Sequence, residues 1–262
     1  DEPNPYYKLP KLSISVYDLN KYIPDTQYEE LTDKAFNFKE FFKTDTDGEF
    51  VHEKDVLRFL DLITTEGVNN FPFSTKEYRQ NLRHTLWMVP GVKEARALEK
   101  LLNKHPVFTH FNIANVAGDG NEEIAEKKSR NIVKKAITDD PLNAYSVTIS
   151  CGKMTRGVSV PEWTAVFMLS NTSSASTYLQ TIFRGQTPWE YRGLLKTECF
   201  VFDFAPDRTL TVVAEVMNIK KKRPTTEEVK SATGKFLNYC SVISATHGEM
   251  KPFSAQKLLH AI

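Results

Sequence analysis

The fold of this chain is decided by AVFML (Ala165–Leu169), an apolar run that lies between TRGVSVP (Thr155–Pro161) and QTIFRGQ (Gln180–Gln186). A short, continuous apolar run is typical of a strand that is buried on both faces, as in a parallel sheet. The stretch before it predicts a strand end and a glycine loop. The stretch after it lies on a predicted helix, which places Gln180 and Arg184 one turn apart. Such a unit can aim a cation at a phosphate group that another domain holds.

Strands and helices alternate on both sides of this unit, which predicts right-handed crossovers and a mostly parallel sheet. A helical insertion with its own small aromatic core is expected in residues 27–81, with a second helix capped by Ser74. A helical extension is expected in residues 207–262. The other predicted strands are 12–17, 84–89, 107–116, 145–150 and 198–204, and the other predicted helices are 53–63, 91–104, 122–137 and 175–183.

Composition describes an ordinary globular protein that has no overall electrostatic preference for a partner. The 262 residues include 40% hydrophobic and 26% charged residues, and the formal net charge is +1. No window approaches the roughly 18 apolar residues that a membrane span requires. The three cysteines have no metal or redox spacing, so we expect reduced thiols in a cytoplasmic protein. The missing initiator methionine suggests a piece of a longer chain.

Several familiar sites are excluded by residue type. Asp45, Asp47 and Gly48 suit a calcium loop, but lysines stand at its first and twelfth positions, which indicates a tight turn instead. The Gly152-Lys153 and Gly234-Lys235 pairs lack the remaining residues of a phosphate loop. No histidine has a metal-ligand spacing with another histidine or a cysteine. The segment therefore should not bind ATP and magnesium tightly by itself.

Three stretches in this order resemble a known family. HTLWMVPGVKEARAL (His84–Leu98) resembles the fourth helicase motif, TRGVSVP the fifth, and YLQTIFR (Tyr178–Arg184) the sixth. Together they resemble the second RecA-like domain of superfamily two helicases, and most of all the helicase-like subunits of type I and type III restriction enzymes. The resemblance implies a RecA-like α/β fold of the P-loop NTPase type over residues 82–206, entered by a strand within residues 1–26.

The resemblance also implies an ATP-hydrolysing helicase or translocase. ATP and Mg²⁺ would be shared with an upstream RecA-like domain of the same chain, with Arg184 and Gln180 as catalytic residues and Gly157, Ser159 and Arg184 at the nucleotide. Nucleic acid, which we expect to be double-stranded DNA, would be bound without sequence preference, and methylation or nuclease modules would lie elsewhere. The residues expected to contact nucleic acid are Pro90, Gly91, Gly118, Ser150, Cys151, Thr155 and Arg156.

The motifs also depart from the family pattern. Ser159 replaces the aspartate of the fifth motif, Phe183 replaces a glycine of the sixth, and Thr187 replaces its second arginine. Either Arg184 serves alone, or Arg192 or another residue substitutes, or hydrolysis is impaired. Two other interpretations remain open. The chain could be a degenerate helicase half that binds nucleic acid or protein, or an unrelated doubly wound enzyme such as a nucleotide-sugar transferase.

Overall fold

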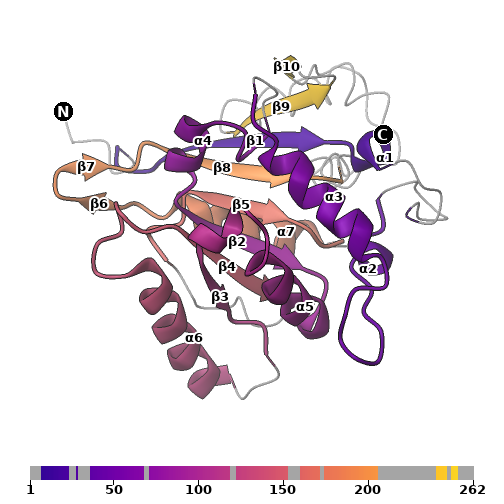
Figure 1. Cartoon of the computed structure of the whole chain (residues 1–262). Coiled ribbons are helices and arrows are strands. Elements are labelled where there is room, and N and C mark those ends of the chain that lie inside the picture. The colour runs from indigo at the N-terminus through magenta and orange to yellow at the C-terminus, as the bar shows by residue number, and fades with distance from the viewer. Residues whose placement is uncertain are drawn as a thin grey trace, which may run out of the picture.

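A single sheet of eight strands organises the molecule (Figure 1), a computed structural model that describes residues 7–23, 28, 36–67, 71–118, 122–152, 160–171, 174–205, 240–246 and 249–252. Seven of the strands are parallel, and β10 pairs antiparallel with β9 at one edge. Across the sheet the order is β10 (Glu249–Pro252), β9 (Cys240–Thr246), β1 (Lys11–Tyr17), β8 (Glu198–Asp203), β5 (Ala165–Met168), β2 (His84–Val89), β4 (Ser146–Cys151) and β3 (Asn112–Asn115).

Helices cover both faces of this sheet, which explains why the central strands are apolar throughout. Every residue of β2, β4 and β5 is buried. In β2, Trp87 and Val89 pack with α3 (Glu53–Thr64) and α5 (Val92–Leu102) on one face. Leu86 and Met88 pack with α6 (Glu122–Ile137) and α7 (Ala175–Ile182) on the other face. The expected mostly parallel sheet flanked by helices is therefore confirmed.

The shorter elements connect these layers. They are α1 (Leu19–Tyr22), α2 (Phe38–Phe41), α4 (Lys76–Asn81), the 3-10 turns η2 (Phe108–His110) and η3 (Phe183–Gln186), and the hairpin strands β6 (Glu190–Tyr191) and β7 (Leu194–Leu195). The hairpin turn uses positive φ at Arg192 (50°) and Gly193 (78°), as a two-residue turn between twisted strands requires. Among the described residues, no helix is long and apolar enough to cross a membrane.

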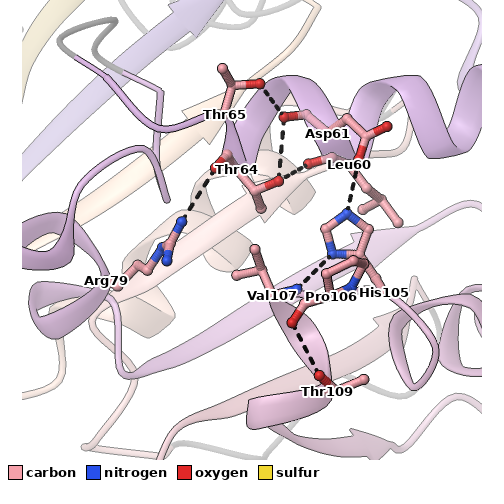
Figure 2. A network of polar contacts seen from close by, with 9 residues as sticks. All are labelled: Leu60, Asp61, Thr64, Thr65, Arg79, His105, Pro106, Val107 and Thr109. Carbon is pink, nitrogen blue, oxygen red and sulfur yellow. Dashed lines mark hydrogen bonds and ion pairs between the residues drawn. The ribbon is translucent and has the colours of Figure 1, made fainter.

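The helical insertion packs directly on the sheet, so its expected separate core is wrong. Its aromatic residues belong to the same buried cluster as Trp87 and Phe167, and the rings of Phe59 and Phe204 meet edge to face with centroids 5.2 Å apart. A polar contact supports this packing (Figure 2), because His105 lies 3.3 Å from the Asp61 carboxylate on α3, and within the insertion Arg79 donates to the Thr64 carbonyl. The insertion and the sheet therefore share one core.

Three other predictions need correction. Residues 240–246 and 249–252 are strands, not part of a helical extension, and the rest of residues 206–262 lies outside the described residues. The strand predicted from 107 to 116 is divided into η2 and the shorter β3. Thr75, not Ser74, caps α4 by accepting from the Tyr78 amide, while the Ser74 hydroxyl donates to the Phe71 carbonyl. The turn predicted at Asp45 is confirmed, because its side chain accepts from two backbone amides.

The parallel strands give the sheet two different edges. In Figure 1 the arrowheads of β1, β5 and β8 point to the right, while the β6–β7 hairpin lies at the left. The carboxyl ends of the strands therefore lie together, and the hairpin lies at the edge where the strands begin. Ligands of open α/β sheets usually bind at the carboxyl edge, so each candidate residue must be assigned to one of the two edges.

Candidate functional site

The turn after β2 brings Pro90 and Gly91 to the carboxyl edge, as the sequence predicts. Gly91 is the N-cap of α5, with φ of −162°. A side-chain carbon at Gly91 would clash with Oε2 of Glu94, so the Glu94 carboxylate stands directly beside this glycine. Glu94 occupies the third helical position, from which a glutamate commonly turns back onto the N-terminus of its helix. A phosphate approaching this helix start would therefore meet a negative charge that the chain itself supplies.

Ser150 and Cys151 are the last two residues of β4, and both side chains are buried. Their neighbour Gly152 is exposed, and apart from its chain neighbours no atom of the described residues lies within 4 Å of where its Cβ would stand. Gly118, which follows β3, is similarly open. Contact with a nucleic-acid backbone at these two loops would therefore use Gly118 and Gly152 more than the side chains of Ser150 and Cys151. Thr155, Arg156, Gly157 and Ser159 lie outside the described residues.

Helix α7 carries the two residues that the sixth motif singles out. It begins after β5, where the Ser174 side chain caps it by accepting from the Thr177 amide. Tyr178 and Ile182 face the sheet and are buried, whereas Gln180 is exposed and donates to the Ser176 hydroxyl at 3.4 Å. The chain then tightens into η3, which contains Arg184. The outer face of α7 is thus a polar surface that ends at an arginine.

Arg184 lies near the edge where the strands begin, away from their carboxyl ends. A Cβ on the adjacent Gly185 would be 3.6 Å from both Cβ of Cys199 and Cγ2 of Val166. Cys199 and Val166 are the second residues of β8 and β5. Gln186 donates to the carbonyl of Pro10, directly before β1, at 3.1 Å. Helix α7 therefore runs back along the sheet and delivers Arg184 to the opposite edge from Gly91.

The Arg184 side chain is half-buried and therefore not sealed in the interior. Burial lowers its pKa from the usual value, yet a guanidinium stays charged at any physiological pH. Thr187 replaces the second arginine of the family pattern, and its hydroxyl donates to the Arg184 carbonyl at 3.3 Å. Phe183 is 44% exposed, which is unusual for a phenylalanine. A half-buried cation beside an exposed aromatic ring suits a surface that a partner covers.

A residue that sequence reasoning missed, Lys196, holds this region together. It follows the β6–β7 hairpin, and its side chain is buried. Its Nζ donates to the carbonyls of Pro161, Trp163 and Gly185 at 2.6, 3.0 and 3.0 Å. The first two acceptors precede β5, and the third directly follows Arg184. The local sequence gives one sign that Lys196 is buried, which is the glycine of the hairpin turn. This turn reverses the chain direction and brings Lys196 back to the interior.

Another missed group is Asp203, which ends β8 at the carboxyl edge and is buried. The Tyr178 hydroxyl donates to Oδ2 of Asp203 at 2.8 Å, and the Ala205 amide donates to Oδ1 at 2.9 Å. These bonds fix the first half of α7 against the sheet. Within the part of the chain that the structure describes, no group of three His, Cys, Asp or Glu side chains could hold a metal ion.

The chain is similar to known proteins of two kinds, although no protein-family model matches it. It is 33% identical over 176 residues, 63% of this chain, to the C-terminus of RM.MpnORF110P of Mycoplasma pneumoniae, which is assigned as a type II restriction enzyme and methyltransferase. This chain covers 24% of that relative. The expected resemblance to restriction enzymes is thus confirmed at the level of sequence.

The chain is also similar to solved structures, two of which are a helicase domain and a restriction-modification enzyme. Domain 2 of the DEAD-box helicase Mss116p, bound to an RNA duplex, has a TM-score of 0.42 at 13% identity, over 86% of this chain and 68% of that one. The ATP-dependent Type ISP restriction-modification enzyme LlaBIII, bound to DNA, has a TM-score of 0.45 at 14% identity, over 91% of this chain and 16% of that one.

Proposed function

We propose that this chain is the second motor lobe of an ATP-dependent restriction-modification enzyme. It would complete, with an upstream lobe of the same protein, a site that hydrolyses ATP. The observation that supports this most is the partial burial of Arg184 and its spacing from Gln180, not its position relative to the carboxyl edge. Arg184 is a half-buried arginine at the end of α7, one turn after Gln180 and beside the exposed Phe183. The sequence relative in Mycoplasma supports the restriction-modification context.

The position of Arg184 changes how the two lobes would meet. The upstream lobe would pack against the outer face of α7 and η3, not against the carboxyl edge of the sheet. In that arrangement the upstream lobe holds ATP and Mg²⁺, and this chain supplies charge. The planar guanidinium of Arg184 would stabilise the negative charge that develops on the transferred phosphoryl group. Gln180, exposed on the same helix, would orient the attacking water or the arginine itself.

Nucleic acid would bind separately, along the carboxyl edge. Gly118 and Gly152 are open there, and backbone amides at such loops contact phosphates without reading bases. Thr155 and Arg156 remain candidates in the same role. The Glu94 carboxylate beside Gly91 weakens the case for a phosphate contact at Pro90 and Gly91. Because ATP and nucleic acid would meet different edges of one rigid sheet, closing of the lobes could couple hydrolysis to movement.

The first test replaces Arg184 with alanine in the full-length enzyme and measures DNA-stimulated ATP turnover. An arginine that stabilises phosphoryl transfer contributes on the order of 10³-fold or more to turnover, and we expect a loss of that size. Arg96→Ala is the matched control, because Arg96 is exposed on α5, on the other face of the sheet. Turnover of the Arg184 variant close to that of the control would refute the proposed role. Arg192→Ala, tested alongside, shows whether the hairpin arginine substitutes.

A second candidate function is a binding platform without ATPase activity. The distance of Arg184 from the carboxyl edge, together with Ser159, Phe183 and Thr187, favours it. Under this alternative the full-length enzyme would bind DNA but would not hydrolyse ATP, even when none of these residues has been substituted. DNA-stimulated turnover by the unmodified enzyme would exclude the platform, and its absence would exclude the motor lobe.

A further inference from the structure

Lys196 joins the end of the fifth-motif stretch to the residue that follows Arg184. Pro161 closes the fifth motif, and Gly185 follows the arginine of the sixth. The amino-acid sequence separates these residues by 24 positions, yet one ammonium group donates to both carbonyls, at 2.6 and 3.0 Å. The third acceptor, Trp163, is itself buried and leads into β5. This lysine therefore links the last residue of the fifth motif to the residue after Arg184.

The bonding of this ammonium group is complete. A lysine ammonium has three donors and no acceptor, and here three carbonyl oxygens receive one hydrogen each. The side chain is 7% exposed, so water supplies little of the solvation of the charge. A buried ammonium is costly unless such acceptors surround it. The three bonds hold the backbone segments that carry the accepting carbonyls, because the loss of any one bond would leave its carbonyl without the lysine as a partner.

We propose that Lys196 is a positioning residue, which sets the placement of Arg184 by holding the Gly185 carbonyl to the segment Pro161–Trp163. The proposal rests on the proposed function of Arg184. Gly185 is the next residue along the chain, so a shift of its carbonyl rotates the backbone that carries the guanidinium. Geometry at a reacting centre is demanding, since a misplacement of about 1 Å can lower a rate by about 100-fold.

The charge state of Lys196 gives this role a pH signature. Burial lowers its pKa to about 8, although the charges of Cys199 and Glu162 act in the opposite direction. A neutral amine has only two N–H donors, so above that pH one carbonyl loses its bond. Glu162 and Cys199 are the titratable groups whose charges act on Lys196, and Arg184 lies nearby on η3. The hollow beside Lys196 is also lined by Glu198, His84 and Arg83. We therefore expect kcat to fall as pH rises through about 8.

The experiment is a double-mutant cycle on DNA-stimulated ATP turnover in the full-length enzyme. Lys196→Met removes the ammonium at similar length, and we expect kcat to fall roughly 10- to 100-fold with KM for ATP unchanged. In a variant that already carries Arg184→Ala, the same substitution should lower turnover no further. Both changes remove the same contribution, which is the charge that a correctly placed Arg184 supplies. Lys104→Met, at an exposed lysine after α5, is the matched control. Lys196→Arg, which stays charged, should retain more activity than Lys196→Met and lose the decline above pH 8.

The outcomes separate this inference from the proposed function. If Arg184→Ala removes turnover while Lys196→Met matches the Lys104→Met control, Lys196 has no positioning role and the proposed function stands. If the two effects multiply in the double variant, Lys196 acts independently of Arg184 and the inference is wrong. If Arg184→Ala retains turnover, both fail together. Should Lys196→Met not fold, the Lys196→Arg variant decides: a pH profile identical to that of the unmodified enzyme overturns the inference.

Discussion

At the residue scale, buried polar side chains in this molecule are held by specific acceptors and donors. His84 begins β2 and is 1% exposed. Its Nε2 lies 2.7 Å from the Pro141 carbonyl, which can only accept, so Nε2 carries the proton and Nδ1 accepts from the Ser146 hydroxyl at 2.8 Å. Both nitrogens of the neutral ring therefore have a hydrogen-bond partner. Protonation of Nδ1 would prevent it from accepting the hydrogen bond of the Ser146 hydroxyl.

This bonding predicts a pH-dependent stability. Burial lowers the pKa of His84 to about 4. Between that pKa and the ordinary value near 6.5 the unfolded chain binds more protons than the folded one, so stability falls as pH falls through this range. The largest loss is about 3 kcal/mol, from roughly 1.4 kcal/mol per unit of pKa. Chemical denaturation at pH 7 and pH 4 should show this extra loss in the unmodified protein but not in His84→Gln. Parallel pH profiles for the two proteins would contradict the assignment.

At the element scale, the sequence predicted the limits of a helix or strand best where its apolar residues keep one spacing from end to end. The limits of β2 and α6 agree with the sequence prediction, because each has a continuous buried run or a clear helical stripe. For the stretch from Val107 to Val116, the sequence predicted one strand where the structure has a 3-10 turn followed by a shorter strand. Phe108 and Phe111 both enter the aromatic core beside Phe73, and only a 3-10 turn brings them there together. Such tertiary packing leaves no periodic signal in the sequence.

Asn171 links two elements that the sequence places far apart. Its amide nitrogen donates to the Phe36 carbonyl and its amide oxygen accepts from the Phe38 amide, each at 2.8 Å. Asn171→Ala should lower the free energy of unfolding by about 1–3 kcal/mol, because both partly buried backbone groups lose their partner. The matched control is Asn143→Ala, because the Asn143 side chain is exposed and its amide donates to Oδ2 of Asp140. Equal unfolding free energies for the two variants would show that the insertion is held by packing alone.

At the scale of the whole molecule, the sequence predicted the class of fold but not the relation between its candidate sites. The order of the motifs along the chain does not say at which edge of the sheet each motif lies. In space, Arg184 and Gly91 lie at opposite edges of the sheet, since α7 runs antiparallel to the strands that flank it. Lys196 was missed for a related reason: its three acceptors come from two distant segments, and no local pattern encodes them.

The central claim is that Arg184 completes an ATP site held mainly by another lobe. The most direct measurement is a structure of the full-length enzyme with DNA and ADP bound to a phosphoryl transition-state analogue such as tetrafluoroaluminate. We expect a guanidinium nitrogen of Arg184 at hydrogen-bond distance, about 3 Å, from the analogue, with the upstream lobe covering α7. An analogue bound at the carboxyl edge, with Arg184 beyond the reach of a bridging water molecule, would contradict the account.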